Sequence, residues 1–93
     1  MFSWLNKQGV KSNKGFIVQS MSRFTIEYRE DSRSILVTVD NGQLPDGRFC
    51  EIIGHDAFSK WDDGTTIPQD KQKEILKNFT AAMEFQGLGV IVK

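Results

Sequence analysis

The side chains best suited to acid–base chemistry gather in one short stretch of the chain. His55 is the only histidine, and Asp56, Asp62 and Asp63 follow it closely. An imidazole titrates near neutral pH, so a neighbouring carboxylate could orient it as a general base. Nucleophilic catalysis also needs a positioned serine or cysteine, and no GxSxG elbow or comparable pattern supplies one. The sequence therefore favours a surface role for His55 and predicts no catalytic residue.

Metal and phosphate sites lack the spacing that they require. Cys50 is the only cysteine, so no Cys/His cluster offers zinc ligands. The aspartates at positions 56, 62 and 63 do not follow the spacing of a calcium-binding EF-hand loop. Gly87-Leu88-Gly89 resembles a glycine-rich loop, but it follows the predicted helix and cannot present a helix N-terminus to a phosphate. We expect neither a metal nor a cofactor.

Trp61 stands directly before Asp62 and Asp63. An aromatic side chain inside a negatively charged rim is a common arrangement at protein interfaces. Two interpretations are open: Trp61 and Phe58 turn inward and close one end of the core, or Trp61 stays exposed as an anchor for a partner. On the second interpretation the partner-binding residues are Trp61, Asp62, Asp63 and Asp56, and the partner presents a basic surface.

Composition narrows the class of protein. The 93 residues, 39% hydrophobic and 26% charged, suit one globular domain. Twelve basic residues balance twelve acidic ones, whereas a nucleic-acid-binding protein of this size usually shows a basic excess. A lone Cys50 cannot form an internal disulfide, and no run of about eighteen apolar residues occurs. We expect a cytoplasmic protein with neither nucleic-acid nor membrane partners.

Hydrophobic patterning predicts the elements that position these residues. Four strands are expected at residues 15–20, 23–29, 33–40 and 48–53. A helix begins near Pro68 and ends before Gly87, and residues 88–92 form a last strand. The order ββββαβ indicates an α+β fold, a mostly antiparallel sheet with one long C-terminal helix packed on one face. Residues 15–93 are predicted to form this single domain, preceded by an N-terminal arm or short helix at residues 1–14.

The second and third predicted strands fix their own register. Phe24, Ile26 and Tyr28 share one face, and Ile35, Val37 and Val39 share one face of the next strand. Both faces reach one core only if the connecting loop has an even number of residues. Tyr28 then lies opposite Ile35, with Asp31 and Ser32 as the turn. The helix contributes an apolar stripe to the same core, which consists of Ile75, Phe79, Ala82 and Met83.

Two features of the apolar pattern stay open. The fourth strand buries either Phe49, Glu51 and Ile53 or Cys50 and Ile52. One sheet face and one helix bury fewer apolar side chains than the sequence supplies. Those left over are Leu36, Ile17, one pair from the fourth strand and the N-terminal cluster of Phe2, Trp4 and Leu5. Either this N-terminal segment covers the back of the sheet, or that face meets a partner, which includes a second copy paired through an edge strand.

Scattered positions between Gly15 and Val92 resemble a small bacterial immunity-protein family of polymorphic-toxin systems. The positions that carry this resemblance are Tyr28-Arg29-Glu30, Val37, Val39, Trp61-Asp62, Ile67-Pro68, Ile75-Leu76 and Phe85-Gln86-Gly87. The resemblance implies a cytoplasmic inhibitor that binds a cognate toxin, with Trp61 and the nearby acids in contact. The expected function is therefore a non-enzymatic protein-binding module. The alternatives are a small enzyme that uses His55 with Asp56 or Asp62, and a homodimeric accessory protein that binds a small molecule.

Overall fold

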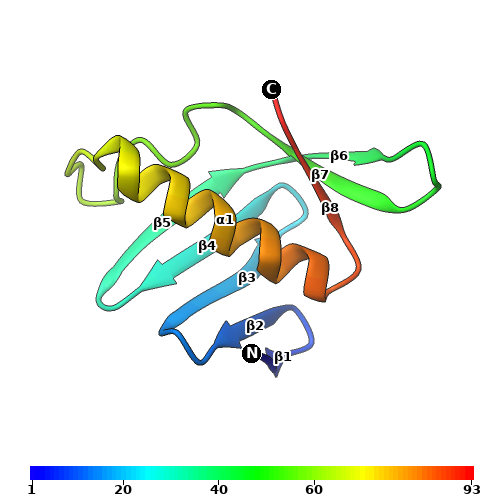
Figure 1. The fold of residues 1–93 in the computed structure, drawn as a ribbon, viewed down its shortest axis with the longest axis horizontal. Helices are drawn as coiled ribbons and strands as arrows, with labels where there is room; N and C mark the ends of the chain where they lie inside the picture. The colour runs from blue at the N-terminus through cyan, green and yellow to red at the C-terminus, as the bar shows by residue number, and fades with distance from the viewer.

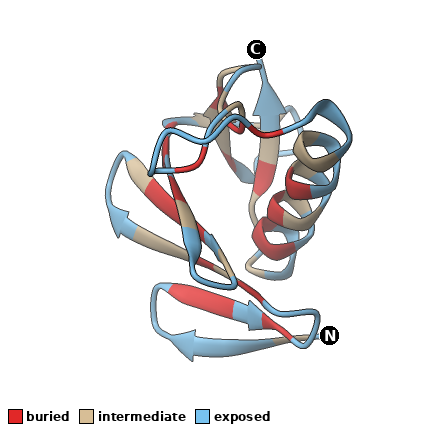
Figure 2. Ribbon diagram, turned by 90° about the vertical axis from the view of Figure 1, so that its left-hand side faces the viewer, coloured by how far each residue is buried: buried red, intermediate tan, exposed pale blue.

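The computed structural model describes residues 1–93 as two sheets and one helix (Figure 1). The larger sheet is antiparallel, in the order β1-β2-β3-β4-β5. Its strands are β1 (Phe2–Asn6), β2 (Gly9–Ser12), β3 (Phe16–Ser22), β4 (Thr25–Glu30) and β5 (Arg33–Thr38). The smaller sheet contains β6 (Asp40–Gln43), β7 (Phe49–Ile53) and β8 (Gly89–Val92). The helix α1 (Gln69–Phe85) lies over one face of the larger sheet (Figure 2).

The α+β class is confirmed, but the prediction of a single sheet in the order ββββαβ is wrong. The last strand, β8, pairs in parallel with β7 in the smaller sheet and does not return to the larger one. The helix accordingly connects two neighbouring parallel strands and is not the last element of the chain. β6 was not predicted, because its Asn41-Gly42 pair is typical of a turn. Gly42 instead lies opposite Cys50, where a Cβ atom would come within 3.2 Å of the Cys50 sulfur.

Residues 1–14 form strands, which corrects the expected arm or short helix. β1 and β2 make a hairpin that continues the larger sheet beyond β3. Gly9 permits this pairing, since a Cβ atom there would lie 2.3 Å from the Cβ of Gln19. The buried Val10 pairs with Val18 and joins the core. Both strands have only four or five residues, too few to show a clear alternation.

The predicted register of β4 and β5 is confirmed. Tyr28 lies opposite Ile35, and Glu30 opposite Arg33, which leaves Asp31 and Ser32 as the turn. Asp31 adopts a φ of 55°, a left-handed conformation that hairpin turns require and that aspartate tolerates.

Phe24 does not share the core face predicted for it. It precedes β4, in the turn after β3, and its side chain is 49% exposed. The Arg23 guanidinium lies 5.4 Å from the centre of its ring.

Neither of the two faces considered for residues 48–53 is buried alone. Cys50 and Ile53 are buried, Glu51 and Ile52 are half-buried, and Phe49 is exposed. Because neighbouring residues of a strand point to opposite faces, the burial of both Cys50 and Ile53 shows that parts of both faces of β7 are covered. Ile53 reaches the main core, while Cys50 lies against Gly42 and Gly89.

A single apolar cluster joins the larger sheet, the helix and the segment between β7 and α1. The predicted helix stripe is confirmed, with Ile75, Phe79, Ala82 and Met83 all buried. Phe79 contacts Phe58 at a ring separation of 5.5 Å. The cluster has sixteen buried members, among them Val10, Val18, Ile26, Val37 and Ile67. The core thus combines residues from β2 to β5, the end of β7, the segment before α1 and α1 itself, whereas β6 contributes none.

Two glutamates sit in contrasting environments. Glu27, on the helix-free face of β4, is 5% exposed and accepts hydrogen bonds of 2.9 Å from Gln19 and from Arg29. Burial by itself raises the pKa of its carboxyl, but these hydrogen bonds and the Arg29 charge lower the pKa overall. Glu51 has one buried carboxylate oxygen without a hydrogen-bond partner, and burial raises its pKa.

Truncating the helix side chain at the centre of the core tests this packing. We expect Phe79→Ala to lower the free energy of unfolding by about 3–5 kcal/mol, because the lost contacts leave a cavity. Denaturant titrations of the parent and the variant should give coincident fluorescence and circular-dichroism transitions. Separate transitions in the parent would contradict one cooperative core.

Because the pKa of Glu27 is lowered and that of Glu51 is raised, we expect removal of the two charges to have opposite effects on stability. Folding raises the pKa of Glu51 above 4.5, so the folded state holds a proton that the unfolded state has already released. The parent therefore loses stability as the pH rises from 4.5 through the raised pKa. Glu51→Gln should therefore raise the melting temperature at pH 7, and the gain should vanish at low pH. Glu27→Gln should lower the melting temperature at pH 7. A carboxylate whose pKa is lowered by folding stabilises the folded state at pH values above its ordinary pKa, and the variant lacks this carboxylate. Melting curves between pH 3 and 8 check both, and equal responses of the two variants would refute the assignment.

Candidate functional site

The segment between β7 and α1 holds the residues predicted to bind a partner, and the structure corrects the role of Trp61. Its side chain is 6% exposed and belongs to the core, together with Phe58. The Arg33 guanidinium lies 5.7 Å from the centre of the indole ring. The inward interpretation is therefore confirmed, and Trp61 supports the loop from beneath instead of offering an exposed anchor.

Asp62 binds the free edge of β5. Its carboxylate accepts hydrogen bonds from the Ser34 hydroxyl at 2.9 Å and from the Leu36 N–H at 3.3 Å. The Asp62 N–H also donates to the Ser34 carbonyl oxygen at 2.9 Å. These bonds occupy part of an edge that would otherwise be open to another strand. They also fix the acidic loop to the larger sheet.

Asp63 orders the tip of the same loop. Its carboxylate accepts a hydrogen bond of 2.9 Å from the Thr65 N–H, and Gly64 between them adopts a φ of 88°. Hydrogen bonds from Thr65 and the nearby charge of Arg33 lower the pKa of the Asp63 carboxyl, against a smaller opposing effect of desolvation. Asp62 and Asp63 are therefore both exposed, and their hydrogen bonds hold the two carboxylates in a defined geometry.

His55 and Asp56 begin the segment and are both exposed. His55 lines a shallow hollow of about 280 Å³ together with Phe58 and the first turns of α1. No hydrogen bond or ion pair joins it to Asp56 or to Asp62, whose carboxylate is bonded to β5. The structure thus brings Asp62 and Asp63 together but does not assemble them around the histidine.

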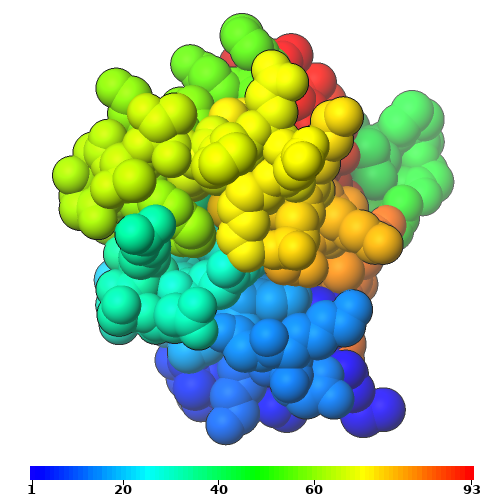
Figure 3. Space-filling model, turned by 60° about the vertical axis from the view of Figure 1, so that its left-hand side comes forward, coloured from blue at the N-terminus to red at the C-terminus, as the bar shows by residue number.

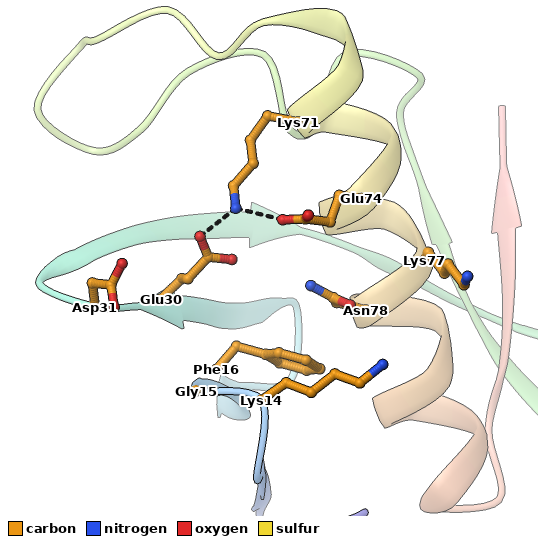
Figure 4. A pocket seen from close by; sticks show the side chains of 9 residues that line it. All are labelled: Lys14, Gly15, Phe16, Glu30, Asp31, Lys71, Glu74, Lys77 and Asn78. Atoms are coloured by element: carbon orange, nitrogen blue, oxygen red, sulfur yellow. Dashed lines mark hydrogen bonds and ion pairs between the residues drawn. The ribbon is translucent and has the colours of Figure 1, made fainter.

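A polar hollow of about 400 Å³, which the sequence analysis did not identify, lies beside this loop. In the space-filling view it lies where the N-terminal strands (blue), the β4–β5 turn (cyan) and α1 (yellow to orange) meet (Figure 3). Figure 4 shows the Lys71 ammonium between the carboxylates of Glu30 and Glu74. Burial alone would lower the pKa of Lys71, but the two carboxylates raise it overall.

The buried Tyr28 is hydrogen-bonded to two residues that line this hollow, Glu30 and Asn78. Its hydroxyl donates to Glu30 at 2.7 Å and accepts a hydrogen bond from Asn78 at 3.1 Å. Burial, followed by the hydrogen bond and charge of Glu30 and the charge of Glu74, raises the pKa of Tyr28, although Asn78 opposes the shift. A buried tyrosine needs a hydrogen-bond partner, and that need was the one signal in the sequence that pointed to this network.

A second hollow of about 420 Å³ continues from the first, since Glu30, Asp31 and Lys71 line both. It ends against Trp61, Arg33 and the loop before α1. The acidic loop and the charged hollow are therefore parts of one continuous surface along the β4–β5 turn. No three histidine, cysteine or acidic side chains converge as metal ligands, and α1 is too short and too polar to cross a bilayer.

Comparisons with protein-family models, with curated proteins and with solved structures gave no match.

Replacing Asp62 tests its position on the β5 edge. We expect Asp62→Ala to lower the free energy of unfolding by about 1 kcal/mol, because it removes hydrogen bonds to Ser34 and Leu36. Asp63→Ala is the matched control, since its carboxylate bonds only within its own loop. Amide hydrogen exchange at Leu36 should accelerate in Asp62→Ala and stay unchanged in Asp63→Ala. Unchanged exchange in both variants would contradict the edge contact.

Proposed function

We propose that the protein is a non-enzymatic protein-binding module, a bacterial immunity protein of the cytoplasm that neutralises a toxin. Its binding surface is the acidic loop with Asp56, Asp62 and Asp63, and its partner presents a basic surface. The observation that carries this proposal is the fixed geometry of two exposed carboxylates, those of Asp62 and Asp63. A binding surface that is already ordered loses less conformational entropy when the partner docks.

The distribution of charge supports a basic partner. Residues 40–63 contain six acidic side chains and two basic ones, although the whole chain is neutral. A carboxylate has about four lone-pair sites, so those of Asp62 and Asp63 retain capacity for a partner's arginine or lysine. Complementary charge at the rim mainly accelerates association and disfavours wrong partners. Trp61 contributes to this surface indirectly, by supporting the loop.

A charge-removal variant tests the proposal without disturbing the edge of β5. Asp56→Asn combined with Asp63→Asn removes two carboxylates, and Glu84→Gln on α1 is the control for loss of charge elsewhere. Native lysates of the source cell are passed over the immobilised parent and both variants, and the retained proteins are identified by mass spectrometry. We expect a basic protein that the parent and Glu84→Gln retain and that the double variant loses.

Binding kinetics of that protein complete the test. The double variant should associate about tenfold more slowly at low ionic strength, with a smaller difference at high salt and little change in dissociation. His55→Ala should bind like the parent, since the histidine takes no part in the acidic rim. Equal association rates for the parent and the double variant would overturn the proposed surface. A large loss caused by His55→Ala alone would favour the enzyme alternative.

A further inference from the structure

β1 forms an open edge of the larger sheet. The other edge, β5, is partly occupied by Asp62, whereas no segment pairs with the outer side of β1. Residues 3–6 are exposed, and β1 appears pale blue at the lower margin of the sheet in Figure 2. The strand contains neither a charged residue nor a proline, the usual devices that protect such an edge. A bulge between Trp4 and Asn6 limits the regular edge to the first residues.

The backbone groups that face outward can be assigned from the pairing with β2. The Asn13 N–H donates to the Met1 carbonyl oxygen at 3.1 Å, and Ser3 lies opposite Lys11 in the same register. Residues of an antiparallel strand point their N–H and C=O groups alternately toward one neighbour and the other. Met1 and Ser3 therefore bond toward β2. The N–H and C=O groups of Phe2 and Trp4 point toward the open edge.

The side of β1 that faces the helix is apolar. Phe2 and Trp4 both contact Phe85 at the end of α1, with ring centres 5.5 and 5.9 Å apart. Trp4 is 54% exposed and Phe85 is 44% exposed, so the cluster remains open to a further apolar side chain. This aromatic cluster lies directly beside the open backbone groups of β1.

On the opposite side of β1, the small residue Ser3 has a basic neighbour. Ser3 lies next to Lys11, an exposed residue whose long side chain can reach across it, and Lys7 follows in the β1–β2 turn. Residues 1–26 contain Lys7, Lys11, Lys14 and Arg23 and no acidic residue at all. A strand added at this edge would thus meet aromatic rings on one side and positive charge on the other.

We propose that β1 receives an extended segment of a partner protein in which apolar and acidic residues alternate. Alternate side chains of a strand point to opposite faces, so the apolar residues pack on Trp4 and Phe85 while the acidic ones approach Lys7 and Lys11. A second copy of this chain is a poor occupant, because pairing two β1 strands would bring two lysine-bearing hairpins together. This site is separate from the acidic loop and does not depend on the function proposed above.

Fluorescence anisotropy with labelled synthetic peptides tests the pattern directly. The first probe alternates glutamate and valine, the second has the same composition in two blocks, and the third alternates lysine and valine. We expect only the first peptide to bind well, about tenfold or more tighter than the other two, since it alone matches both sides of β1. Amide shifts in an NMR titration should concentrate at Phe2 and Trp4.

Variants of β1 separate the backbone, aromatic and charge contributions. Trp4→Pro removes the outward N–H and should abolish binding, whereas Trp4→Val keeps that donor and should weaken binding only in part. Lys7→Glu with Lys11→Glu should weaken binding of the alternating peptide about tenfold, and the control Arg48→Glu less than about twofold. Thermal melts establish whether each variant folds. If Trp4→Pro does not fold, Trp4→Val and the lysine variants decide the outcome.

Three results would overturn the proposal. The first is an affinity for the alternating peptide that is no higher than that for the block peptide, which would exclude recognition of a strand. The second is binding like that of the parent by both Trp4→Val and the lysine variant, which would place the contact elsewhere. The third is a dimer of the parent in sedimentation experiments that is absent in Trp4→Val, because a second copy would then occupy the edge. None of these results depends on Asp56 or Asp63, so failure of the β1 proposal would not affect the binding surface proposed for the acidic loop.

Discussion

The buried hydroxyl of Tyr28 constrains the arrangement of the whole domain. A fully buried tyrosine in the middle of β4 adds much apolar area, but its hydroxyl must find partners inside the protein. Glu30 provides one from the same strand, and Asn78 provides the other from α1. The position of the helix over the sheet is therefore fixed by hydrogen bonding as well as by the less directional packing of Phe79. The Lys71 bridge from Glu74 to Glu30 joins the same two elements nearer the solvent.

Where the sequence predicted the structure, the pattern was regular and the partner was local. Strict alternation set β4 and β5, and the register followed because only an even loop brings both apolar faces to one core. The helix stripe from Ile75 to Met83 was equally clear. β1, β2 and β6 were missed because each has only four or five residues and depends on a glycine or a neighbouring strand. Parallel pairing of β8 with β7 could not be inferred, since nothing in Gly89–Val92 distinguishes one sheet from the other.

The candidate site shows the same limit. The sequence located the acidic loop, but the direction of Trp61 depends on space in the core and on Arg33 from a strand far away in the chain. The charged hollow was not predicted, because Lys14, Glu30 and Lys71 come from three separate elements. The neutral net charge also concealed the separation of charge along the chain. Every charged side chain in the first 26 residues is positive, whereas most of the charged side chains in residues 40–63 are acidic. Averages over a chain of this size say little about its individual surfaces.

The parallel pairing of β7 with β8 has a consequence for how the chain folds. The larger sheet can assemble by successive hairpins, each of which closes a loop of only a few residues. Cys50 and Gly89 are neighbours in the smaller sheet but lie far apart in sequence, with all of α1 between them. The entropy of closing that long segment is lost before any strand pairing compensates it. The hairpin sheet is therefore expected to form early and the β7–β8 crossover late, so the smaller sheet should also be the first part to open when the protein unfolds.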